Sequence, residues 1–445
     1  MTRPHEQPLS PVSRQNGATQ DGEVLLRWSW TEHAVWTERM LTALEQGVKG
    51  NCWFSLIDKV YSAKNLLAAL TKVSVNGGAA GVDQVTVEQF DHDWNTNLER
   101  LSEQLRTGTY RPLAVRRVQI PKPGSHETRP LGIPTVRDRV VQGAVRHVLE
   151  PIFEREFAEQ SYGFRPRRGC KDALRRVDHL LKEGYVYVVD ADLKSYFDTI
   201  PHGPLMDRVR ERIADGRVLT LIESFLKADI MDGLKEWTPE AGAPQGAVLS
   251  PLLSNIYLNP LDHLMAAQGF EMVRYADDFV VLCRSAEEAQ QALEQIQQWT
   301  AHAELTLHPT KTRVVDSRTD GFAFLGYHFQ GDNRRPREKS LNKLKDTVRL
   351  KTRRTNGTSL SMMIADLNPT LVGWFAYFKH SHKYVFTKLD GWIRRRLRSV
   401  LRKRRGLRGL ANGDDNHRWP NRYFAKHGLF SLTTAHALAC QSPRK

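Results

Sequence analysis

The sequence has few cysteines and no long apolar run, and both scarcities narrow the classes of protein it can be. Four cysteines occur in 445 residues, and none forms a Cys-x-x-Cys pair. This spacing supports neither a zinc ribbon nor a disulfide framework, and it is typical of a reducing cytoplasm. No apolar run approaches the ~18 residues needed to span a bilayer. We therefore expect no membrane segment.

The first hundred residues lack both a signal peptide and a P-loop. Residues 1–22 are polar and lack the apolar core of a signal peptide, so we predict a disordered tail there. The glycine-rich stretch at 76–83 lacks the Lys-Ser/Thr ending of a P-loop, so it predicts no Walker-type phosphate site. Apolar periodicity predicts helices within 24–75 and over 87–105, 137–157 and 248–267. Two short basic strands joined by a Pro/Gly turn predict a hairpin over 110–134.

Positive charge is concentrated in the last quarter of the chain. Residues 331–445 carry 27 Lys and Arg against 7 Asp and Glu, whereas residues 1–330 carry 38 and 43. The excess of +15 for the whole chain therefore comes from the C-terminal quarter. A block this basic is typical of a surface that binds polyanions, although a solvated basic helix is the alternative.

The stretch from Phe270 to Arg284 reads FEMVRYADDFVVLCR. Val, Phe and Tyr favour strands and Asp favours turns, so it predicts a hairpin with Asp277 and Asp278 at its tip. Adjacent carboxylates repel each other unless solvent or a cation separates them. On this stretch alone, an exposed turn and a metal site remain equally open.

A third carboxylate shifts this balance. The run from Tyr185 to Leu193 predicts a buried strand that ends at Asp192. Mg²⁺ binds hard oxygen ligands, usually a few carboxylates together with substrate phosphates and water. Three carboxylates at neighbouring strand ends are suited to hold two metal ions for phosphoryl transfer.

Several motifs of the chain, taken together, resemble those of a known family. YADD at 275–278, Asp192 with Phe197 five residues later, and APQG at 243–246 resemble the palm of a reverse transcriptase. SYGFRP at 161–166 is similar to the segment that precedes the first catalytic motif in group II intron reverse transcriptases. The stretches AGVD at 80–83, LHPTKT at 307–312 and FAFLGY at 322–327 resemble further motifs of that family, in the correct order.

The resemblance implies a fold, a reaction and a set of site residues. The fold class is α+β, a right-hand polymerase with fingers, a ferredoxin-like palm and a helical thumb. Asp192, Asp277 and Asp278 are expected to hold two Mg²⁺ ions, with Mn²⁺ as an alternative, and Lys311 to protonate the leaving pyrophosphate. The remaining expected contacts are Lys122, Arg129 and Gln245 with the incoming dNTP, Phe197 with its 2′ carbon, and Arg165 and Arg167 with the nucleic-acid backbone.

Beyond about residue 335 the sequence resembles the maturase domain of group II intron proteins. The stretches at 367–378 and 389–398 predict thumb helices whose Trp, Phe and Leu positions pack together. An arginine-rich face suits an RNA duplex, which offers shape, phosphates and 2′-hydroxyls. No His-Asn-His pattern with paired cysteines follows, as in members without an endonuclease. The residues expected on the RNA face are Arg394, Arg395, Arg398, Arg402 and Arg404.

The expected organisation has four parts: a tail at 1–22, a reverse transcriptase domain at 23–335, a thumb/maturase domain at 336–410 and a basic tail at 411–445. The predicted protein is an RNA-directed DNA polymerase encoded by a group II intron. Its expected partners are the intron RNA, an RNA template, a DNA primer or target DNA, and dNTPs, with no membrane. We expect it in the bacterial cytoplasm, at target DNA in the nucleoid.

Two alternatives remain open from the sequence. One is a splicing-only maturase that binds RNA and has lost polymerisation; the intact carboxylate triad, Gln245 and Phe197 argue against it. The other is a retron, diversity-generating or CRISPR-associated reverse transcriptase. The maturase-like segment argues against that group.

Overall fold

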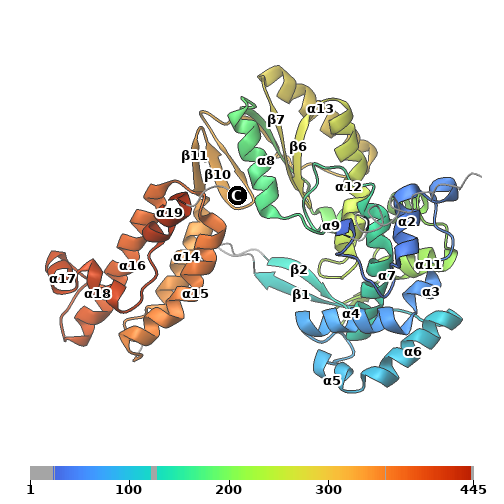
Figure 1. Cartoon of the computed structure of the whole chain (residues 1–445), viewed down its shortest axis with the longest axis horizontal. Coiled ribbons are helices and arrows are strands. Elements are labelled where there is room, and N and C mark those ends of the chain that lie inside the picture. Colours follow the sequence, from blue (N-terminus) through green and yellow to red (C-terminus); the bar gives the residue numbers. More distant parts are fainter. Residues whose placement is uncertain (1–23, 25, 122–127, 356, 442–445) are drawn as a thin grey trace, which may run out of the picture.

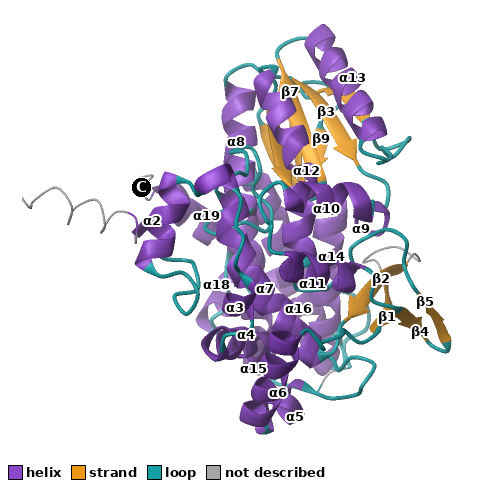
Figure 2. Cartoon of the chain, turned by 90° about the vertical axis from the view of Figure 1, so that its right-hand side faces the viewer, coloured by secondary structure: helices purple, strands orange, loops and turns teal. Residues whose placement is uncertain are grey.

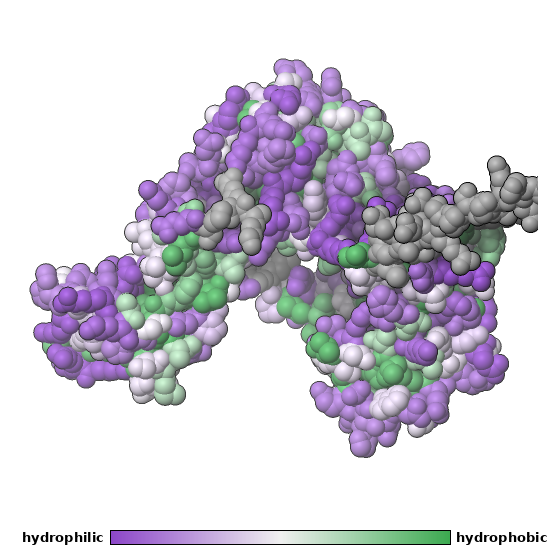
Figure 3. Space-filling view, in the orientation of Figure 1, coloured by the Kyte–Doolittle hydropathy of each residue, from purple (hydrophilic) through white to green (hydrophobic). Residues whose placement is uncertain are grey.

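The computed structural model describes residues 24, 26–121, 128–355 and 357–441, which form three lobes (Figure 1). The predicted disordered tail, residues 1–22, lies outside the described residues. Fingers, palm and thumb follow one another along the chain, except that residues 230–237 return to the fingers sheet. The predicted right-hand polymerase fold is confirmed. In the space-filling view, an open notch separates the thumb from the fingers below the palm (Figure 3).

Helices build most of the fingers. The predicted helix over 87–105 is two helices, because Asp93 leaves helical geometry with φ −105° and ψ 32°. The first of them begins at a capping box in which the Thr86 hydroxyl accepts from the Gln89 amide. The fingers helices are α2 (Glu38–Gln46), α3 (Ile57–Val60), α4 (Ala63–Asn76), α5 (Val87–His92), α6 (Trp94–Thr107) and α7 (Val136–Glu154), with a 3₁₀ turn at Lys49–Asn51.

Helix α7 is the centre of this lobe, and buried residues line most of its circumference rather than one stripe. It packs beside α4, where His147 joins a buried polar network. The His147 ring nitrogen Nδ1 lies 2.8 Å from Asn65 Oδ1, and Nε2 lies 2.8 Å from Lys72 Nζ. A neutral ring that donates from Nδ1 and accepts at Nε2 satisfies both contacts.

This network predicts acid sensitivity of the fingers. Burial, followed by the neighbouring Lys72 charge, lowers the pKa of His147 from 6.5 to about 4. Because the unfolded chain takes up this proton more readily than the folded one, the stability present above pH 6.5 is lost progressively as pH falls from 6.5 to 4. Between pH 7 and pH 5 we expect a loss of about 2 kcal/mol of unfolding free energy. Chemical denaturation at both pH values measures it, and His147→Gln should flatten the slope; an equal slope in that variant would contradict the assignment.

The predicted fingers hairpin is present as β1 (Val115–Pro121) and β2 (Thr128–Ile133), paired antiparallel. It extends into a four-stranded sheet of order β2-β1-β4-β5, through β4 (Ile230–Asp232) and β5 (Lys235–Trp237). Strand β4 pairs parallel with β1, so the segment after α11 (Gly216–Leu226) completes the fingers sheet.

The palm sheet has the strand order β6-β7-β3-β8, and every pairing is antiparallel. Its strands are β3 (Tyr187–Asp192), β6 (Glu271–Tyr275), β7 (Asp278–Cys283) and β8 (Arg313–Asp316). Helical crossovers join β3 to β6 and β7 to β8, which is the ferredoxin-like arrangement that the resemblance implied. The palm helices are α8 (Cys170–Lys182), α9 (Tyr196–Thr199), α10 (His202–Arg210), α12 (Ser250–Ala267) and α13 (Ala286–His302).

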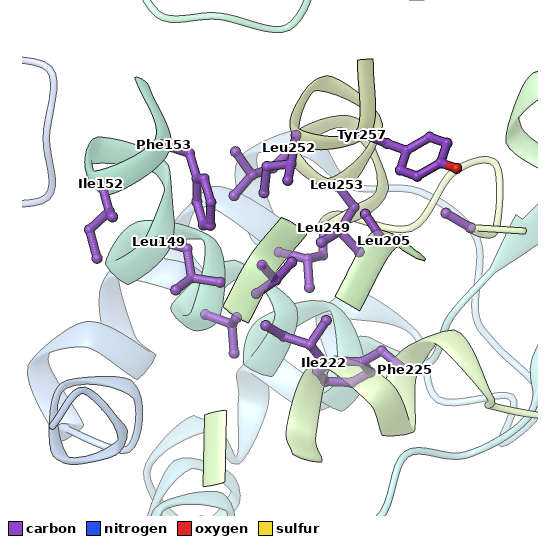
Figure 4. Close-up of a cluster of buried hydrophobic side chains, with 14 of the residues drawn as sticks. Leu149, Ile152, Phe153, Leu205, Ile222, Phe225, Leu249, Leu252, Leu253 and Tyr257 are labelled. Atoms are coloured by element: carbon purple, nitrogen blue, oxygen red, sulfur yellow. The ribbon is translucent and has the colours of Figure 1, made fainter. Parts of the chain in front are cut away.

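Side chains alternate across the palm sheet and feed two cores. Val189, Ala191 and Phe279 belong to the large core that α12 and α13 cover, which continues into the fingers. Its part between α7, α10, α11 and α12 is drawn in Figure 4. Val188 and Val280 belong to the other core, against α8 and a small sheet formed within residues 322–336. The sheet is therefore buried on both sides, and helices flank its strands in Figure 2.

Helix α12 begins two residues later than predicted. Gln142 of α7 accepts from the amides of Val248 (2.9 Å) and Leu249 (3.4 Å), which would otherwise belong to the first turn. An external cap of this kind satisfies free amides before the helix starts. It also ties the APQG loop to the centre of the fingers.

The thumb follows the small sheet β9 (Phe322–Phe324), β10 (Tyr327–Gln330) and β11 (Asn333–Pro336). Its joint with the palm is Tyr377, whose hydroxyl donates to Leu325 O (2.7 Å), while the Tyr327 hydroxyl donates to Tyr377 O (2.7 Å). Phe424 and Leu432 share one core with α14–α16, so residues beyond 410 pack into the thumb. The helices are α14 (Glu338–Lys351), α15 (Leu360–Phe378), α16 (Lys383–Arg404), α17 (Gly413–Arg418), α18 (Asn421–Lys426) and α19 (Leu432–Gln441).

Among the described residues, none of the helices combines the length and the apolar character needed to cross a membrane.

Candidate active site and nucleic-acid interface

Two of the three predicted carboxylates lie side by side on neighbouring strands of the palm sheet. Asp192 ends β3 and pairs in register with Asp278, the first residue of β7. Asp277 occupies the two-residue turn between β6 and β7, after Ala276 in the left-handed region (φ +59°). The tertiary structure thus brings Asp192 beside a pair of carboxylates about 85 positions further along the chain.

The electrostatics of this cluster favour protonation when no cation is present. Burial, and after it the charges of Asp190, Asp277 and Asp192, raise the pKa of Asp278 to about 7. Burial also raises the pKa of Asp277, with Asp192 adding to it, while Arg274 and Lys311 act in the opposite direction. Negative charge is therefore crowded here beyond what the local cations balance.

Asp190 is a fourth carboxylate of the cluster, and the sequence analysis did not assign it. It precedes Asp192 by two positions in β3, so both side chains project from the same face of the strand. Burial raises the pKa of Asp190 to about 6, with Arg313 opposing at 3.8 Å and Asp192 adding. The Asp-x-Asp spacing in a buried strand was the available signal.

Lys311 lies at the same site. Its Nζ contacts Asp192 Oδ2 at 2.6 Å, and its segment is fixed because the His308 amide donates to Asp192 O (2.7 Å). The stretch 307–312 therefore packs directly against the end of β3. This contact places the amino group of Lys311 directly beside the carboxylates.

The donor set suits Mg²⁺ but is not a preformed cage. Carboxylate oxygens are the hard ligands that Mg²⁺ prefers, and the raised pKa of Asp278 reflects charge that a cation would neutralise. In the described part of the chain, no group of three or more His, Cys, Asp or Glu side chains forms a ready metal cluster. Mg²⁺ at phosphoryl-transfer sites commonly uses one or two carboxylates plus substrate phosphates and water. The residues present fit that mode of binding.

Phe197 and Gln245 lie on two segments that contact each other. The Ala243 amide donates to Phe197 O (2.7 Å), and an added Cβ on Gly242 would approach the same oxygen at 2.9 Å. Gln245 O accepts from the Gly132 amide (2.6 Å), which fastens the APQG loop to β2 of the fingers. Phe197 is half-buried beside Tyr196. The two predicted pocket residues are thus held by one loop that bridges palm and fingers.

The fingers residues divide into described and undescribed positions. Arg129 is exposed on β2, opposite Ile120 of β1. Lys122 lies outside the described residues.

Arg165 corrects a sequence prediction. Its side chain is 3% exposed, and its guanidinium pairs with Glu154 (2.7 Å) and donates to the carbonyls of Ala158 (2.5 Å) and Ser161 (2.9 Å). Because these internal acceptors occupy its donors, it does not face nucleic acid. Arg167 is exposed, and its Nη2 donates to Leu26 O (2.9 Å) and to the Ser29 hydroxyl.

The thumb arginines predicted to contact RNA differ in burial and in their partners. Arg398 is buried, and it donates to Trp419 O (2.9 Å) and Asn421 Oδ1 (2.8 Å), so it joins α16 to the segment after α17. Arg402 pairs with the buried Asp415 (3.0 Å), and Arg404 is exposed and donates to Thr358 O. Arg395 is exposed, while Arg394 is half-buried, 3.8 Å from Asp390. Nε and Nη2 of Arg398 are thus engaged inside the thumb, which argues against its predicted role as an RNA contact.

Two grooves lie on the thumb. The first, about 710 Å³, runs between the small sheet, α14 and α16, and is called here the thumb groove. Its polar and aromatic lining includes His328, Arg335, Arg337, Lys345, Lys388 and Trp392. The second, about 720 Å³, is called the arginine groove. Its lining includes Arg394, Arg395, Arg398, Asn412, Asn416 and Asn421.

Two protein families match this chain, one after the other. The family "Reverse transcriptase (RNA-dependent DNA polymerase)" matches residues 120–329, which contain the carboxylate cluster. The family "Group II intron, maturase-specific domain" matches residues 341–419, which contain α15–α17, most of α14 and the thumb arginines between 394 and 404.

Similar proteins agree with these matches. Protein YkfC of Escherichia coli is 36% identical over 300 residues, 58% of this chain and 78% of that protein. Group II intron-encoded protein LtrA of Lactococcus lactis is 40% identical over 189 residues, 42% of this chain but only 31% of LtrA. A solved structure titled partial Cas6-RT-Cas1–Cas2 complex is 24% identical, covering 56% of this chain and 41% of that chain at a TM-score of 0.36, which is too low to compare whole-chain arrangements. With a reverse transcriptase domain followed by a maturase domain, this chain belongs to the family of reverse transcriptase/maturases encoded by group II introns, which are RNA-directed DNA polymerases.

Proposed function

We propose that the protein extends a DNA primer on an RNA template by using Asp192, Asp277 and Asp278 as its metal-binding carboxylates. The observation that carries this proposal is the in-register pairing of Asp192 with Asp278 beside the Asp277 turn. Two bound Mg²⁺ ions, or Mn²⁺ in their place, would activate the primer hydroxyl and neutralise charge on the leaving pyrophosphate.

Side chains of this chain carry the remaining roles. Lys311 holds a proton at Nζ beside Asp192 and is the proposed donor to pyrophosphate. Gln245 and the half-buried Phe197 ring form the proposed dNTP pocket, with Arg129 and Lys122 contributing positive charge toward the triphosphate. Arg313, at the start of β8 in the palm sheet, opposes the charge of Asp190, and Arg337, directly after β11, opposes that of Asp278.

The thumb is the proposed binding surface for the intron RNA. We treat residues 23–335 as the polymerase unit and residues 336–441 as one maturase unit, because Phe424 and Leu432 complete the core of α14–α16. Arg395, Lys403 and Arg405 are exposed on or directly after α16, where they are accessible to phosphates. Binding there would couple splicing of the intron to its copying at target DNA in the bacterial cytoplasm.

One preparation of the protein tests both activities. Primer extension on an RNA template with dNTPs and Mg²⁺ should yield complementary DNA, and chelation of the metal should abolish it. The same preparation should accelerate splicing of the intron that encodes it. Splicing without any extension would instead favour the splicing-only alternative.

The exposed thumb charges predict a change in salt dependence. Replacing Arg395, Lys403 and Arg405 together with Gln should lower the log–log slope of intron RNA affinity against salt by roughly 2 to 3. The reason is that each phosphate contact made on binding releases counterions from the RNA, so a variant with fewer contacts releases fewer of them. Filter binding between 50 and 500 mM KCl, roughly the range where counterion release dominates, measures the slope.

A matched control carries the same change in charge elsewhere. Lys182 and Arg208 are exposed on palm helices, and Lys227 is exposed at the end of α11; replacing all three with Gln should leave the slope nearly unchanged. Equal slopes for both triple variants would show that α16 does not contact RNA phosphates.

A further inference from the structure

We propose that a buried frame, made by Arg274, Asp262, Asn255 and Gly163, positions the turn that carries Asp277. The inference rests on the proposed function, because it assigns a positioning role for that same site. It also gives a role to the SYGFRP segment, which the polymerisation chemistry does not use directly.

Arg274 is the centre of the frame. It precedes Asp277 by three residues in β6, and its side chain is fully buried. The guanidinium makes a two-pronged contact with Asp262 of α12, through Nε to Oδ1 (2.7 Å) and Nη2 to Oδ2 (2.5 Å). Its remaining nitrogen, Nη1, donates to the Ala276 carbonyl at 2.8 Å. One buried cation therefore links the helix behind the sheet to the peptide that leads into Asp277.

A buried ion pair carries a desolvation cost. Burying an arginine carries a large desolvation penalty unless its donors are satisfied, whereas burying an apolar side chain is favourable. Here Asp262, Asn255 and the Ala276 carbonyl take the donors, and the two carboxylate oxygens of Asp262 are taken in return. Apolar residues would pack a helix against a sheet equally well. What the charged pair adds, and an apolar pair could not supply, is the directed hydrogen bond from Arg274 to the Ala276 carbonyl.

The SYGFRP segment closes the frame from the other side. The Arg274 amide donates to Gln160 O (2.9 Å), and the Tyr162 amide donates to Arg274 O (2.8 Å), so residues 160–162 extend the edge of β6. Asn255 Nδ2 donates to Gly163 O (2.8 Å), while its Oδ1 accepts from Arg274. Asn255 thus ties both sides together.

Gly163 lies directly against the turn. A Cβ added there would overlap the Ala276 amide nitrogen and stand 2.8 Å from the Tyr275 carbonyl carbon. Ala276 itself has a left-handed backbone (φ +59°), which is unfavourable for alanine and persists only where surrounding contacts impose it. The frame supplies these contacts on both faces of the turn, and it fixes the direction in which Asp277 leaves the sheet.

Two glycine variants test the contact without removing any polar group. Gly163→Ala should shift the turn and lower the turnover rate of primer extension about 100-fold, because misplacement by about 1 Å has effects of that size. Gly203→Ala is the matched control, since nothing lies within 4 Å of its added Cβ and its φ is ordinary. Template–primer affinity should change in neither variant. Equal turnover rates for the two would overturn the positioning role of Gly163.

A test of the Arg274–Asp262 ion pair needs a variant that still folds. Arg274→Met alone leaves Asp262 buried and unpaired, so Arg274→Met is combined with Asp262→Leu to remove both charges. The double variant should keep its cooperative unfolding but lose turnover about 100-fold, with the KM for dNTP within about threefold. Hydrogen–deuterium exchange of the peptide over 274–280, measured without metal or substrate, should be faster than in the wild type.

The readouts separate this inference from the proposed function. A wild-type protein without extension activity would refute the proposed function, whereas the exchange measurement would still report on the frame. A folded double variant with wild-type turnover and wild-type exchange at 274–280 would refute the frame. Faster exchange with normal turnover would show that Arg274 fixes the turn without serving catalysis, which also overturns the proposal.

Discussion

Asp277→Asn is expected to lower primer extension by about 10³-fold or more while the protein continues to bind and splice its intron. The substitution keeps the shape of the side chain but removes one negative charge from the proposed metal site. Phosphoryl transfer depends mainly on metal positioning and charge neutralisation, so this loss acts on the chemical step. The proposed RNA surface lies on the thumb, on elements that do not include the β6–β7 turn.

Stability gives an independent readout of the same variant. Burial raises the pKa of Asp277, and Asp192 adds to it, so the carboxylate opposes folding when it is ionised without a cation. Asp277→Asn should therefore unfold at a slightly higher temperature than the wild type in the absence of metal, and it should gain less from added Mg²⁺. Asp207→Asn, at an exposed position on α10, is the control and should behave as the wild type. Joint loss of splicing and synthesis in folded Asp277→Asn would refute separate surfaces for the two activities.

Phe197→Ala is expected to lower the preference for dNTPs over rNTPs by roughly 10- to 200-fold, the range that one steric contact in a pocket supplies. The ring is half-buried, and its backbone carbonyl is held by the Ala243 amide, so the side chain cannot easily move away from a bound sugar. Removing the ring would make room for a 2′-hydroxyl. The measurement is kcat/KM for each of the paired nucleotides in single-nucleotide primer extension.

Loss of packing must be separated from loss of the steric contact. Phe90→Ala removes the same atoms from a buried position of α5, which lies at the end of the fingers away from the palm (Figure 1). That variant should lose stability but keep the sugar preference. Phe197→Val should give an intermediate preference, because it retains part of the bulk. An unchanged preference in both Phe197 variants would leave that residue as an ordinary packing residue.

Local patterns were sufficient for much of the site. The hairpin at 270–284 and the strand ending at Asp192 could be predicted because Val, Tyr and Phe mark strands and Asp marks their ends. The order of the motifs then indicated the palm, whose strand order is the ferredoxin-like one. Helix ends were less predictable: the break at Asp93 and the later start of α12 depend on a single backbone angle and on Gln142, a residue distant in sequence.

Arginines show most clearly where sequence reasoning fails. Arg165 and Arg398 lie in basic stretches that indicated nucleic-acid contact, yet both are buried and donate to internal carbonyls. Arg274 gave no signal beyond one charge in an apolar strand, and it lies at the centre of the active-site frame. The partner of a guanidinium decides its role, and that partner lies up to 23 positions away in these cases.

The sequence by itself was enough to indicate the family, the reaction type and the candidate carboxylates, because these depend on residue identity and short spacing. Only the tertiary structure decided which carboxylates share a face, which arginines remain free for RNA, and how the Asp277 turn is held. Those properties come from pairings between segments far apart in the chain, such as β3 with β7 and Gly163 with Ala276. Burial and pairing change the cost of a charge far more than its neighbours in sequence do, so the role of a buried arginine or aspartate is settled only once the chain has folded.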